Sequence, residues 1–228
     1  GFHGVDWDAM KIAYAPKLAG IGNDREFVEL LSEMLGELNV SHCGARAIAQ
    51  NPHADETASL GIFVDTNYSG EGIRITEVMR NGPLDRSGFT VKPGMAIVSI
   101  NGVAISSETD SARYLNRLAG KRTALSVLDP ETGKTTNLVV IPISSKEERI
   151  LLYERWVRLN EQEVEKSGNG RLGYVHIPGM SDGSYRHVYE KAMGKYFDRE
   201  GLIVDTRFNG GGDLVGDITM FLSGERFM

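Results

Sequence analysis

The spacing of the apolar residues changes twice along this 228-residue chain, and the changes divide it into three regions. Over 24–38 they recur every three or four positions, which is typical of an amphipathic helix. Over 60–141 they alternate with polar residues, as in half-buried strands, and after that the helical spacing returns. The pattern predicts a multi-domain α+β fold. Its expected domains are an N-terminal helical part (1–58), a β-module (59–143), and a linker helix with the start of an α/β unit (144–228).

The first region contains one strong helix signal. Asn23 or Asp24 can cap a helix that runs to about Asn39. Residues 1–23 mix glycine, proline and aromatic side chains, so we expect them to pack against other parts rather than form a long regular element. Small and polar residues at 41–44 predict a turn before the apolar stripe resumes at 45–49.

The second region alternates strands with turns that contain glycine or proline, such as Asn101-Gly102. Short helices are expected at 83–87, where proline can occupy the first helical position, and at 107–118. These elements predict a small, partly open β-barrel with two helices. The expected strands are 60–65, 72–79, 95–100, 124–128 and 136–141.

The third region begins with an amphipathic helix to about Val164, which the Ser167–Gly170 segment ends. A strand (172–177), a helix (185–197), a buried strand (202–205), a glycine turn (209–212) and a helix to about Leu222 follow in that order. Two parallel strands alone leave both sheet edges unpaired. We therefore expect more chain, or another subunit, to complete the sheet.

Composition and charge narrow the classes of function. The net charge of −6 is spread along the chain without a basic stripe, which argues against a nucleic-acid partner. No apolar run approaches about 18 residues, so no membrane span is expected. The chain is therefore expected to be soluble. Because it begins with glycine it is expected to be a fragment, and its compartment stays open between cytoplasm and periplasm.

Metal and cofactor sites are not expected. The five histidines show neither H-x-x-x-H nor H-E-x-x-H spacing, and Cys43 is the single cysteine, so structural or solvated histidines are the default interpretation. The histidines are His3, His42, His53, His176 and His187.

The segment Asp205–Gly212 runs from a strand through three glycines into a helix. Such a turn can present free backbone N–H groups to an anionic intermediate. A phosphate-binding loop is disfavoured because neither Gly-Lys-Ser/Thr nor G-x-G-x-x-G is present. An ordinary strand-to-helix turn is the other interpretation.

The β-module resembles a PDZ domain of the bacterial peptidase type, through Leu60-Gly61-Ile62 and the long phrase from Ile75 to Gly102. The resemblance implies a groove in which a peptide C-terminus adds as a strand. A module that only closes a barrel or acts as a spacer is the alternative. The expected peptide-binding residues are Leu60, Gly61, Ile62, Ala112, Leu115 and Leu118.

Four phrases in order resemble the tricorn family of C-terminal processing serine peptidases: Glu37–His42, the PDZ-like module, Leu172–Pro178 and Asn209–Gly212. The resemblance implies hydrolysis of peptides or unfolded protein tails. By position, it implies that His42 is the general base, Ser41 its orienting neighbour and Gly212 an oxyanion donor. It also implies a ring-forming homo-oligomer.

The same resemblance places the serine nucleophile and a glutamate beyond Met228, so the 228-residue chain by itself is expected to be inactive. Ser181, in Ser181-Asp182-Gly183, has the composition of a nucleophile elbow but stands where the family has a plain loop. Two alternatives stay open: a non-catalytic PDZ scaffold with a degenerate peptidase-like unit, and a self-sufficient chain that uses Ser181.

Overall fold

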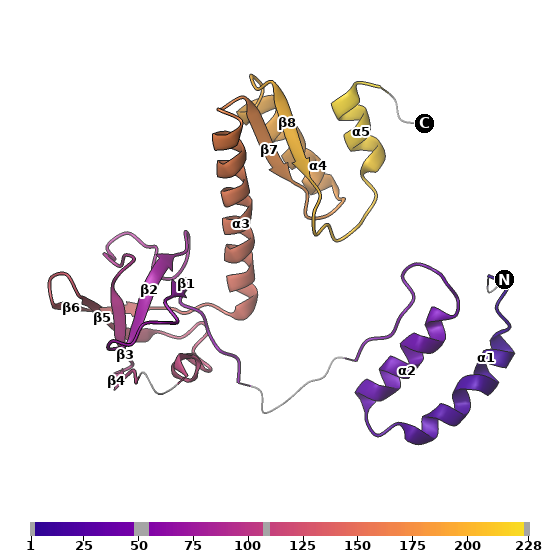
Figure 1. Ribbon diagram of the computed structural model, residues 1–228, viewed down its shortest axis with the longest axis horizontal. Coiled ribbons are helices and arrows are strands. Elements are labelled where there is room, and N and C mark those ends of the chain that lie inside the picture. Colours follow the sequence, from indigo (N-terminus) through magenta and orange to yellow (C-terminus); the bar gives the residue numbers. More distant parts are fainter. Residues whose placement is uncertain (1–2, 48–54, 107–109, 226–228) are drawn as a thin grey trace. The chain divides into compact units, whose positions relative to one another are not determined.

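The computed structural model describes residues 3–47, 55–106 and 110–225 (Figure 1). The chain forms two compact units, Gly1–Ala54 and Asp55–Met228. The domain boundaries expected at 58/59 and 143/144 stay predictions.

The first unit contains helix α1 (Trp7–Tyr14), a 3-10 turn (Ala15–Gly20) and helix α2 (Asp24–Gly36). The cap at Asn23 is confirmed, since its side chain accepts the N–H of Glu26 at 3.0 Å. No long regular element was expected over 1–23, and the elements there are short, but the eight-residue helix α1 was not expected. Asp6 caps α1 by accepting the N–H of Ala9 at 3.0 Å. An aspartate before a helical segment is a common N-cap, so Asp6 is the residue in the sequence that marks this helix start.

The turn after α2 holds Ser41 and His42, as expected. Two residues there have a left-handed backbone, Asn39 with φ of 45° and His42 with φ of 64°. The Ser32 hydroxyl bonds both the N–H and the carbonyl of Ala45 at 3.0 Å, which ties the turn back to α2. The resumed apolar stripe is not helical at 45–47, and 48–49 lie outside the described residues.

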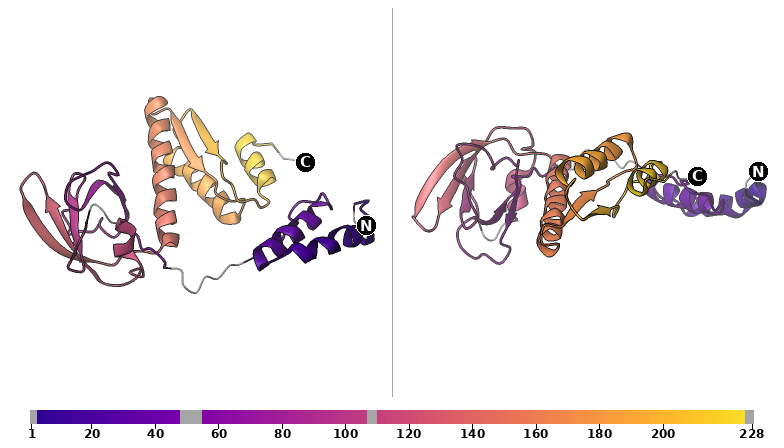
Figure 2. Two further views of the ribbon diagram at one scale, coloured as in Figure 1. Left: turned by 60° about the horizontal axis from the view of Figure 1, so that its bottom comes forward. Right: turned by 90° about the horizontal axis from the view of Figure 1, so that it is seen from above.

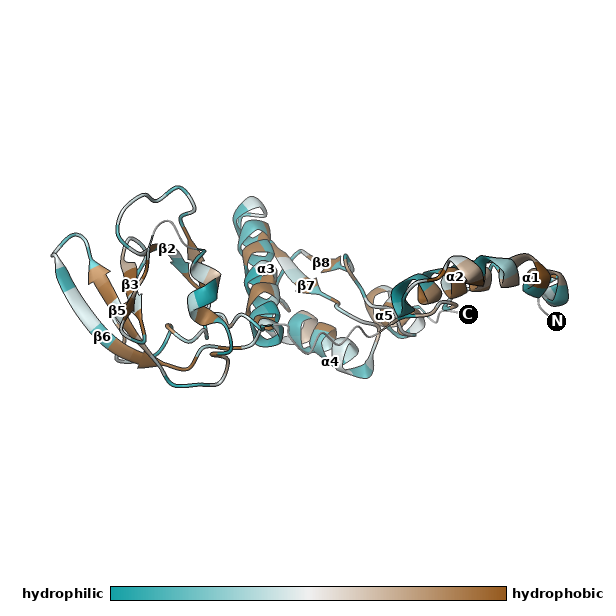
Figure 3. Cartoon of the chain, turned by 90° about the horizontal axis from the view of Figure 1, so that it is seen from below, coloured by the Kyte–Doolittle hydropathy of each residue, from teal (hydrophilic) through white to brown (hydrophobic). Residues whose placement is uncertain are grey.

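The β-module is an open antiparallel sheet in the order β1-β2-β3-β5-β6, with β4 paired to β3. All five expected strands are confirmed within about two residues, and the short β4 after Asn101-Gly102 was missed. Leu60, Ile75, Ile97 and Leu125 belong to the buried core, and Figure 3 shows brown, apolar segments on β3 and β5. The strands are β1 (Ile62–Val64), β2 (Ile73–Val78), β3 (Ala96–Ile100), β4 (Val103–Ala104), β5 (Thr123–Asp129) and β6 (Lys134–Val140).

Both helices expected in this module need correction. Residues 83–87 form turns rather than a helix, because Leu84 is drawn into the core and the Asp85 carboxylate accepts the N–H of Asn81 at 2.8 Å. The helix expected at 107–118 is a 3-10 turn over Ser111–Leu115, and 107–109 lie outside the described residues.

Helix α3 (Ser145–Ser167) begins at a capping box formed by Ser144 and Glu147, which the sequence analysis missed, and it runs about three residues past the end expected near Val164. Its N-terminal half docks on the sheet. Arg155 forms a bidentate ion pair with Glu77 of β2, with N–O distances of 2.6 and 2.7 Å.

The remaining elements confirm the expected β-α-β-α order. Strands β7 and β8 are parallel, with Leu172 opposite Gly201 and His176 opposite Asp205, and they lie side by side in Figures 1 and 2. Neither outer edge has a partner strand within the described part of the chain. The elements are β7 (Leu172–His176), α4 (Asp182–Glu190) with a π-turn (Lys191–Lys195), β8 (Gly201–Asp205) and α5 (Val215–Ser223).

Among the described residues, no helix is both long and apolar enough to cross a membrane.

Candidate functional site

The glycine turn after β8 is fastened to the segment that follows β7. Gly210 donates its N–H to the Pro178 carbonyl at 3.0 Å, and the Asn209 amide donates to the Ile177 carbonyl at 2.9 Å. In return, Met180 donates its N–H to the carbonyl of Gly211 at 2.8 Å. These bonds join two connections that are about 30 residues apart in sequence, so the turn has a defined shape.

Gly212 occupies a position that only glycine fits. Its φ is +120°, and a Cβ atom built there would lie 2.2 Å from the Met180 carbonyl oxygen. Its own N–H donates to no acceptor found among the described residues. The turn therefore exposes one backbone donor at a position fixed by the neighbouring segment.

A buried carboxylate anchors the start of this turn. Asp205 is 7% exposed and accepts the Tyr174 hydroxyl at 2.7 Å, together with the Arg207 guanidinium at 2.6 to 3.0 Å. Hydrogen bonds from Arg207 hold the pKa of Asp205 well below its usual range and outweigh burial, which acts in the opposite direction. Burial and the Asp205 carboxylate raise the pKa of Tyr174. Asp205 is thus a fixed, ionised anchor rather than a general base.

His176, at the end of β7, is a structural histidine, as the sequence analysis expects by default. It is 4% exposed, and its Nε2 lies 2.7 Å from the Arg207 carbonyl oxygen. Because a carbonyl only accepts, Nε2 carries the hydrogen. Its Nδ1 lies 2.9 Å from the Tyr153 hydroxyl, and Trp156 meets the ring edge-on at a centroid distance of 4.8 Å. The histidine therefore joins α3 to the glycine turn.

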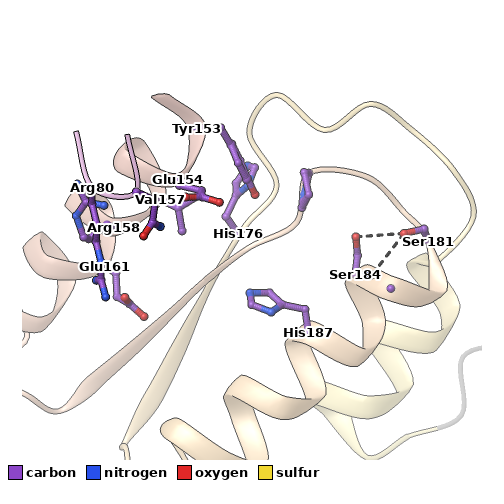
Figure 4. Close-up of a pocket in the computed structure, with 13 residues that line it drawn as sticks. Arg80, Tyr153, Glu154, Val157, Arg158, Glu161, His176, Ser181, Ser184 and His187 are labelled. Atoms are coloured by element: carbon purple, nitrogen blue, oxygen red, sulfur yellow. Dashed lines mark hydrogen bonds between the residues drawn. The ribbon is translucent and has the colours of Figure 1, made fainter. Parts of the chain in front are cut away.

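A cleft of about 610 Å³ lies within the second unit, between α3, the end of β7 and the start of α4 (Figure 4). Ser181 sits at its rim and caps α4 by accepting the Ser184 N–H at 3.4 Å, so its position is explained without catalysis. His187 is exposed and points into the cleft, where partial desolvation lowers its pKa and so favours the neutral ring. The cleft is lined by Arg80, Asn81, Tyr153, Glu154, Val157, Arg158, Glu161, His176, Pro178, Ser181, Gly183, Ser184 and His187.

Glu161 is the most strongly held carboxylate of the cleft. Burial disfavours its charge, but hydrogen bonds from Lys195, Tyr196 and Lys191 outweigh this and lower its pKa to about 2. Both lysines reach the Oε1 atom, at 2.7 and 3.0 Å. The negative charge of Glu161 is therefore neutralised by the two lysines of the π-turn that follows α4.

The residues expected to carry catalysis lie in different units. Ser41 and His42 are exposed in the turn after α2 in the first unit, and Gly212 belongs to the second. The meeting of the imidazole with the glycine turn stays a prediction.

The expected peptide-binding residues belong to two segments, the start of β1 with the residues before it and the 3-10 turn Ser111–Leu115 with the residues after it. Leu60 is buried in the core, and Ile62, Leu115 and Leu118 pack partly buried against it; Ala112 is half-buried in the 3-10 turn. Gly61 has φ of +67°, and its N–H already donates to the Ser59 hydroxyl at 3.0 Å. Its packing against Pro83 alone explains the glycine, since a Cβ would lie 2.8 Å from the proline ring. Peptide binding here stays a prediction.

Three family models match the chain in sequence order. They are the tricorn protease C1 domain over 1–36, the tricorn protease PDZ domain over 65–145, and peptidase family S41 over 171–224. The chain thus resembles tricorn proteases over three successive stretches.

Curated relatives support this relationship along most of the chain. A tricorn protease homolog 1 from Streptomyces coelicolor is 31% identical over 218 residues, and a tricorn protease homolog from Saccharolobus solfataricus is 30% identical over 220 residues. Each alignment covers 92% of this chain and 20% of the relative. The tricorn-related chain therefore spans about a fifth of the length of these relatives.

The fold is shared with a crystal structure of the tricorn protease, at a TM-score of 0.78 and 21% identity. That match covers 97% of this chain and 22% of the other. The sequence predicted that Gly212 lies in the glycine turn. It did not predict the contacts among Tyr153, Trp156 and His176 that hold this turn against α3. Their aromatic character was visible in the sequence, but their proximity depends on the packing of α3 against β7.

Proposed function

We propose that this chain contributes the general base and the oxyanion donor of a serine peptidase that hydrolyses peptide bonds in peptides or protein tails. The observation that carries the proposal is Gly212, an obligatory glycine whose N–H has no acceptor among the described residues, within the region that matches peptidase family S41. A free N–H at a fixed position is what a developing oxyanion requires.

The proposed roles follow the chemistry of acyl transfer. A serine hydroxyl attacks the carbonyl carbon while the neutral imidazole of His42 takes its proton, and Ser41 orients that imidazole. The carbonyl π electrons move to oxygen, and the Gly212 N–H stabilises the resulting negative charge. The imidazolium then donates its proton to the amine nitrogen as the C–N bond breaks and the amine leaves. Water next attacks the acyl-enzyme carbonyl while His42 takes its proton, and His42 returns the proton to the serine oxygen as the ester bond breaks and the acid leaves.

We further infer that the nucleophile and a glutamate are additional to the residues assigned here, so that the 228-residue chain alone should not hydrolyse peptides. Residues 59–143 would form a partly open PDZ barrel that captures a substrate C-terminus along β1. The unpaired edges of β7 and β8 favour a homo-oligomeric full-length protein, since such edges invite pairing.

The test uses the full-length protein as its gene encodes it. We expect His42→Ala to lower kcat for a fluorogenic peptide by about 10⁴-fold or more, the effect of losing a triad member. His3→Ala is the matched control, because His3 is also exposed and also has a left-handed backbone, with φ of 54°. Equal rates for intact and His42→Ala protein would remove the histidine from the mechanism. Peptide binding without any hydrolysis would favour the scaffold alternative.

A further inference from the structure

A second cavity, of about 250 Å³, lies beside the glycine turn. Its walls come from α3, from the end of β7 with the segment that follows it, and from the residue before the glycine turn. We call it the aromatic cavity; it is lined by Tyr153, Trp156, His176, Pro178 and Phe208.

The walls present rings rather than free polar atoms. The Tyr153 hydroxyl and Nδ1 of His176 bond each other at 2.9 Å, and Nε2 of His176 bonds the Arg207 carbonyl at 2.7 Å. The Arg207 guanidinium lies 5.2 Å from the Trp156 ring, but its charge is held by Asp205. A charged or strongly polar group entering the cavity would lose water without gaining a partner, so the cavity favours apolar groups.

Phe208 is the unusual member of this wall. It is 86% exposed and has φ of +59°, a backbone that a bulky residue adopts only when the surroundings impose it. Its ring meets Trp156 edge-on at a centroid distance of 5.9 Å. An exposed aromatic ring held open on one side can add another ring with the geometry that aromatic pairs prefer.

The size of the cavity fits a large side chain. A cavity of about 150 Å³ lined by apolar side chains is enough to bind benzene, and the aromatic cavity has about 250 Å³. A phenyl group or a leucine side chain therefore fits without displacing the walls.

The cavity also lies close to the proposed oxyanion donor. Phe208 precedes Gly212 by four residues, a separation of at most about 14 Å along an extended chain. Pro178, another wall residue, accepts the N–H of Gly210 within the same turn. A substrate held at Gly212 would thus place one of its neighbouring side chains at the cavity.

We propose that the aromatic cavity is a specificity subsite that accepts an aromatic or large aliphatic side chain of the peptide substrate, within about four residues of the cleaved bond. This inference rests on the proposed peptidase function. The aromatic cavity favours substrates that carry an apolar residue at one position, and contacts with Phe208 and Trp156 determine which side chain binds there.

Binding can be measured without hydrolysis. In a Trp7→Phe variant of the 228-residue chain, Trp156 is the single tryptophan and reports on the cavity by fluorescence. We expect N-acetyl-phenylalaninamide to bind at least about tenfold more tightly than N-acetyl-alaninamide, because burial of a phenyl group accounts for that difference. Phe208→Ala should abolish the difference. Phe197→Ala is the matched control, since Phe197 is 76% exposed and lies outside the cavity lining.

The second measurement is kcat/KM of the full-length protein for peptides that carry Phe, Leu, Lys or Asp at each position around the cleaved bond. We expect a preference of about tenfold or more for Phe or Leu at one position, and its loss in Phe208→Ala but not in Phe197→Ala. Saturable binding of the phenylalanine probe without any hydrolysis would contradict the peptidase function and leave the cavity as a binding site. Hydrolysis with no such preference, or a Phe208→Ala variant that only loses thermal stability, would overturn the subsite.

Discussion

The Nε2 atom of His176 lies 2.7 Å from the carbonyl oxygen of Arg207, and this bond joins the end of β7 to the turn that carries Gly212. The same ring bonds Tyr153 of α3 at 2.9 Å. One buried side chain thus connects the linker helix, the parallel sheet and the proposed oxyanion turn. The shape of the turn depends on this connection as well as on its own glycines.

Replacing His176 by alanine should destabilise the chain by about 2–3 kcal/mol, because it removes a buried ring and leaves the part-buried Arg207 carbonyl without its donor. His176→Gln should cost less, since the amide can still donate. The shift of the urea midpoint measures both changes. His187→Ala, which alters an exposed histidine, is the control. An equally small shift for all three variants would contradict the structural role of His176.

Gly212→Ala should distort the glycine turn, because the new Cβ would lie 2.2 Å from the Met180 carbonyl oxygen at φ of +120°. In the full-length protein we expect kcat to fall by about 10²-fold or more, the loss associated with one oxyanion donor. Gly210→Ala is the matched control, because the nearest atom to its Cβ lies at 3.7 Å. Comparable activity of the two variants would argue against Gly212 as the donor.

The Arg155–Glu77 ion pair should couple α3 to the β-module. The two side chains are 29% and 35% exposed, and their bidentate bonds are short. A double-mutant cycle in urea should give a coupling of about 1 kcal/mol. The exposed helical pair Arg186–Asp182 should give less than about 0.5 kcal/mol. Similar couplings for both pairs would mean that docking of α3 does not depend on Glu77.

Glu161 should make the stability of the folded chain fall at acidic pH. Its pKa is lowered to about 2 in the folded chain from an ordinary value of 4.5. Its stabilising effect is therefore fully present above about pH 4.5 and is lost as the pH falls toward 2. Glu161→Gln should lower stability at pH 7 and make the decline of the urea midpoint between pH 5 and pH 3 shallower. The exposed Glu163→Gln should leave that decline unchanged.

Ser181 should not react as a nucleophile. Its hydroxyl caps α4 and contacts Ser184 rather than a histidine. We expect no labelling of the 228-residue chain by a fluorophosphonate probe, and mass spectrometry of the treated chain measures this. Labelling that disappears in Ser181→Ala would establish the self-sufficient alternative.

The sequence determined the features that depend on near neighbours. Alternation indicated the long strands of the β-module, Asn23 marked the start of α2, and three successive glycines indicated the turn at Gly212. Local backbone preferences and capping suffice for these, because the interacting groups lie within a few residues. The same preferences misled at 83–87, where burial of Leu84 outweighed the proline signal for a helix.

Tertiary structure alone decided what the glycine turn is fastened to and what lies beside it. His176, Tyr153 and Phe208 come from three separate elements, and no periodicity relates them. Their meeting follows from the packing of α3 against β7 and from the parallel register that sets His176 opposite Asp205. Contacts of this kind depend on long-range burial rather than on the local pattern, and for that reason the network and the aromatic cavity appear only in the folded chain.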